Sequence, residues 1–307
     1  MATSMFDATA YANEQITATF DMVWALDAGL WNLRQATTRF LQNHSNATNK
    51  QLQDSLIPGL RIHGLNPMRI AVELSWEYEE QYIAGLLLIN ATAIFDSWVD
   101  SFVDAAVTMT NKKRKSIKKK MKEGDFSELD NALAQEKRSS LAGCFHLSHN
   151  RQDKYIDNLR LIYKYFKSCR NCVAHGDQKF SSIAETNYKA INNLTRVDCG
   201  IKEFPKIEPT IANNPLKMVL RGVVGFYDVM IRIIYHYDCI AAEKEGADKE
   251  ILKRWKRIPS ITLSPLEKKR NSSIRAYMSS HNMCSPYVEK TSDVYNFLVS
   301  NNAIHKT

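Results

Sequence analysis

The amino-acid sequence predicts an all-α fold, on the evidence of its composition and of its apolar spacing. Glycine and proline are scarce, with 11 and 8 among 307 residues, and this scarcity favours long helices over a β architecture rich in turns. Apolar residues recur every three or four positions in four long segments, the spacing that gathers them on one face of a helix. Amphipathic helices bury such faces by packing together, so we expect a four-helix bundle.

The first two predicted helices flank a segment rich in helix breakers. The first begins near residues 13–15, and its apolar stripe consists of Val23, Leu26, Leu30, Leu33, Thr37 and Phe40. The second runs from about Arg69 to Met109, with a stripe of Ile83, Leu87, Ala91, Ile94, Trp98 and Phe102. Between them, residues 45–67 contain two prolines and two glycines, which interrupt helices.

The third and fourth predicted helices enclose an irregular segment. The third carries Tyr155, Leu159, Ile162, Phe166, Cys169 and Val173, and we expect Gly176 to end it. The fourth carries Val219, Val223, Phe226, Met230, Ile233, Tyr237 and Ile240. Between them, the short alternating pieces and prolines of residues 195–214 predict either a small β-hairpin or an irregular insertion.

The apolar density falls after about residue 245, where basic residues become frequent again. We therefore expect a helical bundle over residues 1–245 and a basic C-terminal extension over residues 246–307. A last helix is predicted near Thr291–Ser300. The sequence contains no internal repeat and no Ser/Gly linker that would demand two separate domains.

The chain is basic, with a formal net charge of +8 and an isoelectric point near 9.0. A basic excess suits a polyanionic partner such as RNA, although net charge determines attraction and not fold. The N-terminal residues lack a basic segment followed by an apolar one, and the longer apolar stretches are too short or contain charges. We expect a cytoplasmic protein that does not contact a membrane.

Residues 170–175, RNCVAH, lie at the end of the third predicted helix and combine the residue types that RNA cleavage needs. Histidine titrates near neutral pH and acts as an acid or a base. Arginine offers a planar, permanently charged fork to phosphate oxygens, and asparagine can donate to a phosphate or orient an imidazole. RNA supplies its own nucleophile in the 2′-hydroxyl, so this chemistry requires no metal and no cofactor.

This segment resembles the Arg-x(4–6)-His motif of the HEPN-domain superfamily, helical bundles named for higher eukaryotes and prokaryotes nucleotide-binding. The matching positions are Arg170, the polar Asn171 directly after it, and His175 after four intervening residues. The resemblance extends over residues 13–245 at most. It implies a HEPN-like four-helix bundle and a metal-independent endoribonuclease that leaves 2′,3′-cyclic phosphate and 5′-hydroxyl ends.

The resemblance also implies a biological setting. HEPN nucleases of this size often act as prokaryotic toxins or phage-defence effectors, so we expect an RNA substrate and an antitoxin or a defence-complex partner. Some HEPN toxins carry a tyrosine two residues after the histidine, where a partner enzyme modifies it. This sequence has Asp177 there, so that mode of neutralisation is not expected.

The spacing of the motif favours a dimer. Five positions along a helix rotate by about 140° and rise by about 7.5 Å, so Arg170 and His175 do not share one face. Two chains related by a two-fold axis can instead bring both sets into one cleft. HEPN nucleases generally act as such dimers, which implies a homodimer with a composite active site. In that site Arg170 would stabilise the phosphate, His175 would act as acid and base, and Asn171 would orient one of them.

A basic run follows the second predicted helix. Residues 111–122 read NKKRKSIKKKMK and could neutralise several phosphates of an RNA. The residues that we assign to RNA binding are Lys112, Lys113, Arg114, Lys115, Lys118, Lys119 and Lys120. Such a run is also typical of a solvated helix face or, in a eukaryotic chain, of a nuclear localisation signal.

Two further patterns leave more than one interpretation open. Asp96, Asp100 and Asp104 recur every four positions, so this ladder is solvent-exposed, matched by basic residues, or a cation site. Cys169 and Cys172 form a Cys-x-x-Cys pair, but no second pair completes a zinc site, and core packing is expected.

The motif itself has a non-catalytic interpretation. Arginine and histidine are common at the C-terminal ends of helices, where they interact with the last carbonyl groups. In that case the chain is a helical module that binds RNA or protein without cutting, as part of a larger defence complex. Cleavage of single-stranded RNA distinguishes the two functions.

Overall fold

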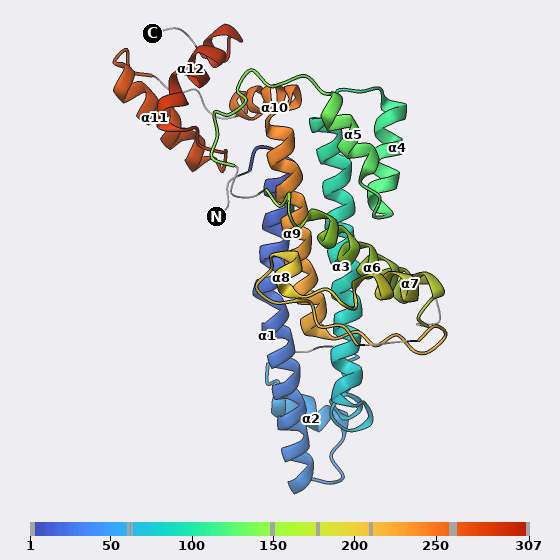
Figure 1. Cartoon of the computed structure of the whole chain (residues 1–307). Helices are drawn as coiled ribbons and strands as arrows, with labels where there is room; N and C mark the ends of the chain where they lie inside the picture. Colours follow the sequence, from blue (N-terminus) through green and yellow to red (C-terminus); the bar gives the residue numbers. More distant parts are fainter. Residues whose placement is uncertain are drawn as a thin grey trace.

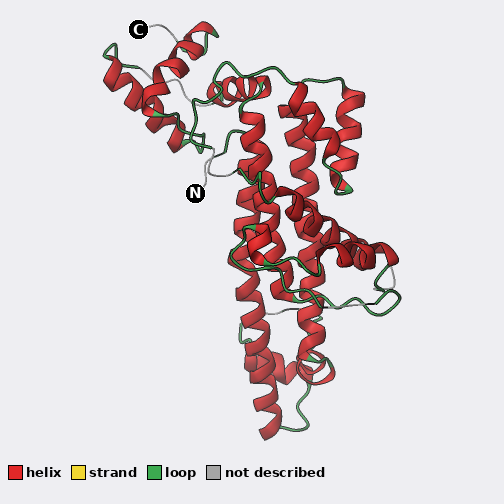
Figure 2. Cartoon of the chain, viewed as in Figure 1, coloured by secondary structure: helices red, strands yellow, loops and turns green. Residues whose placement is uncertain are grey.

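The computed structural model describes residues 4–59, 62, 64–147, 151–175, 179–208, 211–257 and 263–304. The structure is about 70% helical, and no strand occurs in these ranges (Figure 2). The predicted all-α fold class is confirmed. Extended residues pair within the described ranges as isolated bridges, one of which joins Lys179 to Pro215.

Four long helices form the core, and they correspond to the four that the sequence predicts. They are α1 (Asp7–Asn43), α3 (Trp76–Ala106), α6 (Ile156–His175) and α9 (Leu220–Ala242). In Figure 1, α1, α3 and α9 run along the long axis of the molecule, and α6 lies across α3 and α9. The apolar stripe predicted for α9 is buried almost throughout, which makes α9 the central helix of the core.

The second long helix begins later than predicted. A π-helical turn over Arg69–Glu73 precedes it, and the chain is extended at Leu74 before α3 begins. Ser75 sets this start, because its Oγ accepts a hydrogen bond of 3.2 Å from the backbone N–H of Tyr78. The predicted helix from about 69 to 109 is therefore two pieces, of which only the second is a regular α-helix.

The buried face of α3 is rotated relative to the predicted stripe. Ile83 and Leu87 were expected in the core but are only half-buried, whereas Ala84 and Leu88 are fully buried. The reason is that α3 contacts α1, α6 and α9 at once, so no single stripe describes its buried surface. A similar correction applies to α1, where Leu26 was expected in the core and is 58% exposed.

Shorter helices surround this core. They are α2 (Asn49–Leu56), α4 (Asn111–Lys122), α5 (Ser127–Gln135), α7 (Ser182–Ile191), α8 (Arg196–Cys199), α10 (Glu245–Lys256), α11 (Glu267–Ser280) and α12 (Thr291–Ser300). The insertion between α7 and α9 contains α8 and irregular chain over its described residues, so the irregular alternative holds there and the hairpin does not. The last predicted helix is confirmed as α12.

Side chains from α9 and α10 hold the start of α1. The Asp238 carboxylate accepts hydrogen bonds from the backbone N–H groups of Met5 and Phe6, at 2.7 and 3.1 Å. Glu250 accepts a third from the N–H of Asp7, at 3.1 Å. These groups have no partner within α1 because they lie at its N-terminal end. The first helix is thus fixed to residues near the end of the bundle.

A second polar network fixes α6. The guanidinium of Arg160 donates to both carboxylate oxygens of Asp130, at 2.8 Å each, and contacts the Tyr237 hydroxyl. It also lies 5.4 Å from the ring centroid of Phe126. Because these partners belong to α5, α9 and the turn before α5, the network ties the N-terminal part of α6 to these elements.

Candidate active site

The motif lies at the C-terminal end of α6, as predicted. The helix continues through Arg170 and Asn171 to His175, its last residue. The His175 side chain, Gly176 and Asp177 lie outside the described residues, so the predicted end of the helix at Gly176 is tested only up to His175. Arg170 and His175 belong to one continuous helix, which keeps them on different faces as the spacing indicates.

Arg170 is half-buried and lies next to a buried tyrosine. Its Nη1 donates to Oδ1 of the exposed Asn171 at 3.2 Å, while its buried Nε has no hydrogen-bond partner among the described residues. The hydroxyl of Tyr163 is fully buried and likewise has no partner within the described ranges. Burial raises the pKa of Tyr163 well above its usual value, with smaller contributions from Asp96, which raises it, and Arg170, which lowers it. Because Nε is buried, a phosphate would bind at the terminal nitrogens of the guanidinium.

Two contacts hold this end of α6 against α3. The Lys167 ammonium lies 2.9 Å from a carboxylate oxygen of Asp96. One turn and a half further on, Val173 packs over Gly85, where an added Cβ would lie 3.5 Å from Cγ1 of Val173. The motif therefore sits beside the N-terminal half of α3.

The two cysteines near the motif are core residues. Cys169 is fully buried and Cys172 is 5% exposed, in agreement with the predicted packing role. Burial raises the pKa of the Cys169 thiol to about 12. A thiol that stays protonated at neutral pH is a poor nucleophile and a poor metal ligand.

The carboxylate ladder of α3 is matched by basic residues. Asp100 pairs with Lys122 at 2.7 Å, and Asp104 pairs with Lys118 at 2.8 Å and with Arg114 at 3.7 Å. With Asp96 paired to α6, every step of the ladder has a cation from α4 or α6. This excludes the cation-site interpretation in favour of matched charges.

The basic run divides into two faces because it forms the helix α4. Ile117 and Met121 are buried against the core, and the cations beside them reach the α3 ladder. Lys120 pairs with Glu128 of α5 at 3.1 Å. The cations of α4 that are exposed and form no ion pair with another described residue are Lys112, Lys113, Lys115 and Lys119.

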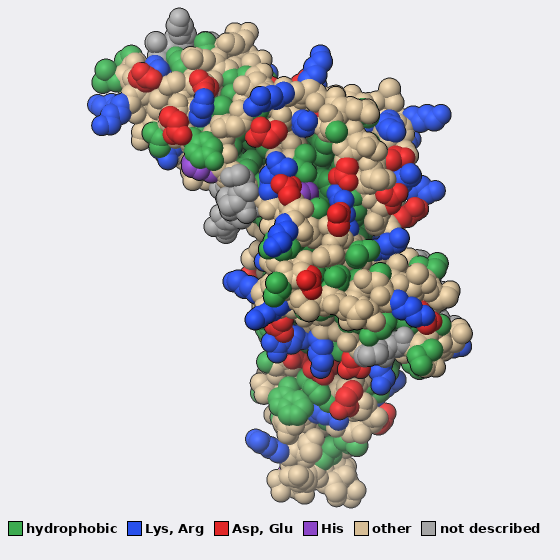
Figure 3. Space-filling model, in the orientation of Figure 1, with side chains coloured by type: hydrophobic (Ala, Val, Ile, Leu, Met, Phe, Trp, Pro, Cys, Tyr) green, Lys and Arg blue, Asp and Glu red, His purple; other side chains and the backbone are tan. Residues whose placement is uncertain are grey.

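Three of these exposed cations form one stripe on α4, because Lys112, Lys115 and Lys119 recur at spacings of three and four. In Figure 3, blue side chains project at the upper right, where Figure 1 places α4. The turn after α4 packs on α6, since an added Cβ at Gly124 would lie 3.3 Å from Cβ of Lys164. Lys164 is exposed and precedes the motif on α6 by six residues.

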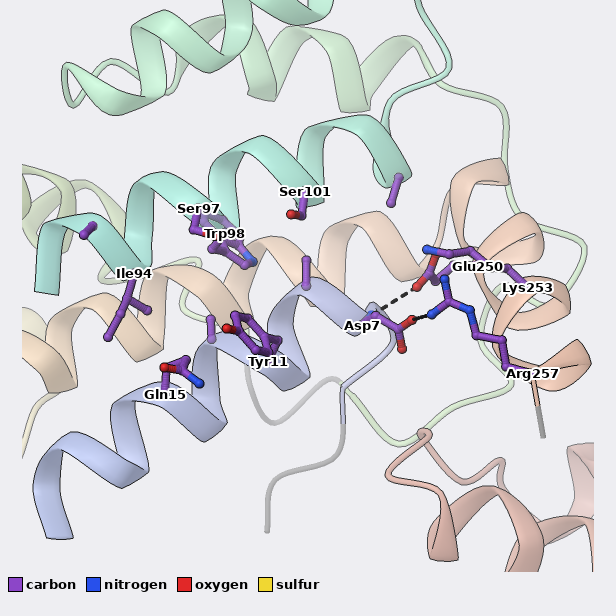
Figure 4. Close-up of a pocket in the computed structure, with 14 residues that line it drawn as sticks. Asp7, Tyr11, Gln15, Ile94, Ser97, Trp98, Ser101, Glu250, Lys253 and Arg257 are labelled. Carbon is purple, nitrogen blue, oxygen red and sulfur yellow. Dashed lines mark hydrogen bonds and ion pairs between the residues drawn. The ribbon is translucent and has the colours of Figure 1, made fainter. Parts of the chain in front are cut away.

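Two grooves open along α3. One, of about 430 Å³, adjoins the motif at Val173 and is lined mainly by Tyr78, Tyr82 and Leu86. The other, of about 420 Å³, lies between α1 and α3 and is floored by small residues such as Ser97 (Figure 4). Sequence reasoning missed both grooves. The sequence pattern that could have indicated them is a second series of α3 residues, spaced by four and outside the predicted core stripe.

Within the described ranges, no group of three or more histidine, cysteine, aspartate or glutamate residues could hold a metal ion. Comparison of the chain with protein-family models, with curated proteins and with solved structures found no match. The functional argument therefore depends on the residues of this chain and their arrangement.

Proposed function

We propose that this protein is a metal-independent endoribonuclease of the HEPN type, built on a HEPN-like four-helix bundle. The observation that carries the proposal is the position of Arg170 and Asn171 on the last turns of α6, a helix whose exposed Lys164 contacts the turn after the lysine-bearing α4. Asn171 accepts a hydrogen bond from Nη1 of Arg170, which orients the planar fork that a phosphate clamp requires. The remainder of α6 is anchored in the core, which holds the motif in one place.

The proposed reaction uses the RNA as its own nucleophile. An imidazole of His175 removes the proton from a 2′-hydroxyl, and this oxygen attacks the adjacent phosphorus. The bond to the 5′-oxygen breaks, and the leaving oxygen receives a proton from a protonated imidazole. Arg170 stabilises the negative charge that accumulates on the phosphoryl oxygens. The products are a 2′,3′-cyclic phosphate and a 5′-hydroxyl.

A homodimer supplies both imidazole roles and both arginines. Because Arg170 and His175 lie on different faces of α6, a phosphate bound by one arginine is reached more readily by the histidine of a second chain. The proposed site is therefore composite. A toxin or phage-defence role in the cytoplasm, with an antitoxin or defence-complex partner, accompanies this proposal through the motif resemblance.

Cleavage of single-stranded RNA should persist in excess EDTA. The reason is that the proposed groups are an arginine, an asparagine and a histidine, none of which needs a metal for this chemistry. The measurement is the cleavage rate of an end-labelled RNA with EDTA and after addition of Mg²⁺ or Mn²⁺. Activity that EDTA abolishes and Mg²⁺ restores would contradict the mechanism.

Replacing Lys112, Lys115 and Lys119 with glutamine should weaken RNA binding about tenfold or more. Each cation that no longer neutralises a phosphate lowers the salt slope by about 0.7 for single-stranded RNA, or about 2 for the triple variant. Binding is measured with a cleavage-inactive protein at several salt concentrations.

The matched control removes the same charge from the other face of α4. Glutamine at Arg114, Lys118 and Lys122 deletes the partners of the α3 ladder but leaves the exposed stripe intact. This control should keep a steeper salt slope than the first triple variant. Equal slopes would show that net charge, and not the stripe, governs binding.

The exposed lysine stripe also supports a second function, a helical module that binds RNA without cutting it. Binding that depends on the stripe, together with intact RNA after prolonged incubation, would select this function over the nuclease.

A further inference from the structure

The outer face of α3 is unusually apolar for an uncovered surface. Of the described helices, α3 is the one long and apolar enough to cross a membrane, and 44% of its most apolar window is buried inside the protein. Tyr78, Tyr82 and Leu86 are 55%, 58% and 53% exposed. Exposed large apolar side chains that line up on one face indicate a contact surface.

This face continues as a stripe of small residues. After Leu86, the exposed positions are Asn90, Ala93, Ser97 and Ser101, so the spacing along α3 remains three or four. Tyr11 and Ala12 of α1 form the opposite wall of the groove above these small residues, as Figure 4 shows for Tyr11. The face therefore has a bulky N-terminal half and a hollow C-terminal half.

The two halves match each other about one point. Tyr78 and Ser101 are equally distant from the midpoint between Ile89 and Asn90, and so are Tyr82 and Ser97. Leu86 and Ala93 form a third pair with the same midpoint. If a second α3 packs antiparallel across that midpoint, each bulky side chain faces a small one.

We propose that two copies of this chain associate through this face of α3, related by a two-fold axis beside Asn90. Tyr78, Tyr82 and Leu86 of each subunit pack against the partner's Ser101, the partner's Ser97 and the partner's Ala93. The contact is isologous, so every large-to-small pair occurs twice. It identifies the surface of the homodimer on which the proposed composite site depends.

The α3 face supplies most of the contact area that a specific dimer needs. From Tyr78 to Ser101 the helix extends about 35 Å, and a helix is about 10 Å wide. Two such faces bury about 700 Å², below the roughly 1,000 Å² that a specific interface needs, so the α1 walls of the two grooves must supply the remainder. The contact removes apolar surface of Tyr78, Tyr82 and Leu86 from water, which favours association.

Charged residues lie at both ends of the face. Glu77 is exposed and precedes Tyr78, so it lies at the N-terminal end of the bulky half. Lys253 and Arg257 line the far end of the groove between α1 and α3, where they pair with Glu250 at 3.1 Å and with Asp7 at 2.7 Å (Figure 4). The antiparallel arrangement brings Glu77 of each subunit toward this paired group, so the match of large and small side chains, and not charge, carries the association.

The arrangement also places the two motifs correctly for a shared site. A two-fold axis in the plane of the contact keeps α6 on the same side of the paired α3 helices in both subunits. Val173 packs at Gly85, and the position related to Gly85 by the axis is 94. The two α6 ends are then offset by about 14 Å along the pair, on one side of it, where a single RNA strand can reach both.

Cysteine crosslinking tests the axis directly. Asn90→Cys should form a disulfide-linked dimer on mild oxidation, because each introduced thiol meets its own copy near the axis. The matched variant Ser101→Cys should stay monomeric on a non-reducing gel, because its two thiols are about 35 Å apart. All six native cysteines are buried, so they do not compete. Crosslinking of both variants, or of neither, would overturn the proposal.

An exchange of bulk tests the register. Ser97→Tyr places two tyrosines against each other, and Tyr82→Ser leaves a void, so each should raise the dimer Kd roughly tenfold or more. The double variant restores one tyrosine and one serine at every contact and should recover the wild-type Kd. Light scattering measures the mass, and Ser182→Tyr on the exposed start of α7 is the control for an added ring. A double variant as weak as the worse single one would contradict the register.

These measurements are independent of RNA cleavage. A protein that dimerises as described but never cuts RNA would remove the proposed function and leave the surface standing. A wild-type protein that cuts RNA while monomeric at tens of micromolar would remove the surface and the composite site. Binding of α3 to lipid vesicles in place of self-association would likewise overturn the dimer.

Discussion

Arg170→Ala and His175→Ala should each lower the rate of RNA cleavage by about 100-fold or more. The first removes the group that stabilises charge on the phosphoryl oxygens, at a cost of about 3 kcal/mol in the barrier. The second removes the acid and base, without which the 2′-hydroxyl is not activated. Single-turnover cleavage of an end-labelled RNA measures both effects.

Neither substitution should unfold the protein. Arg170 is half-buried and donates a hydrogen bond to the neighbouring Asn171, so its removal costs few contacts among the described residues. Lys189→Ala is the matched control, because it deletes an exposed cation on α7 that pairs only with Glu185. It should cleave at the wild-type rate. A His175→Ala protein that cuts RNA normally would end the nuclease proposal.

Mixing the two inactive variants tests whether the site is shared. Heterodimers contain one composite site with an intact arginine from one chain and an intact histidine from the other. If one such site suffices, mixing restores part of the activity. If both chains must supply both residues, an excess of either variant added to wild-type protein should instead suppress activity. Activity that simply scales with the amount of wild-type chain would show independent sites.

Much of the fold could be predicted because apolar spacing reports burial directly. Five positions of the stripe predicted for α9 are buried, but every residue from 233 to 239 is buried too, because the helix is enclosed by its neighbours. α3 was less predictable because it contacts α1, α4, α6, α9 and α10 and still exposes large apolar residues. The exposed Leu86 and the buried Leu88 are chemically alike, and only the arrangement of neighbouring helices distinguishes them.

The candidate site was predictable to a lesser degree. Composition identified α4 as a basic run but could not separate Lys118, which pairs with Asp104, from Lys119, which is exposed. That separation requires the helical phase of α4 relative to α3. The state of the α3 carboxylate ladder could not be predicted for the same reason. Whether each carboxylate is solvated or paired depends on a helix that lies elsewhere in the chain.

Two buried groups of α9 should give the protein opposing responses to acid. Burial lowers the pKa of His236 to about 4, although Asp153 raises it and Arg160 lowers it further. Burial raises the pKa of Asp238 to about 6, against the lowering effect of the Met5 and Phe6 N–H groups. His236 also accepts a hydrogen bond from the backbone N–H of residue 152, at 3.1 Å, which favours its neutral form.

The signs of the two contributions follow from proton binding. Between pH 6.5 and 4, the unfolded chain protonates His236 and the folded chain does not, so this group removes stability as the pH falls. Between pH 6 and 3.8, the folded chain protonates Asp238 and the unfolded chain does not, so this group adds stability as the pH falls. Each amounts to about 3 kcal/mol, at about 1.4 kcal/mol for each pKa unit.

The two contributions therefore nearly cancel in the wild-type protein between pH 6 and 4, and single variants should separate them. His236→Gln keeps an acceptor for the N–H of residue 152 and leaves Asp238 alone. Relative to wild type, its free energy of unfolding should rise by about 3 kcal/mol when the pH is lowered from 7 to 4. Asp238→Asn leaves His236 unchanged. Relative to wild type, its free energy of unfolding should fall by a similar amount over the same pH range. It should also be lower at every pH, because an amide cannot accept both N–H groups.

Urea unfolding followed by circular dichroism at pH 7, 6, 5 and 4 measures both pH dependences, and each variant serves as the control for the other. Two variants that follow the wild-type pH dependence would show that neither group changes its protonation on folding.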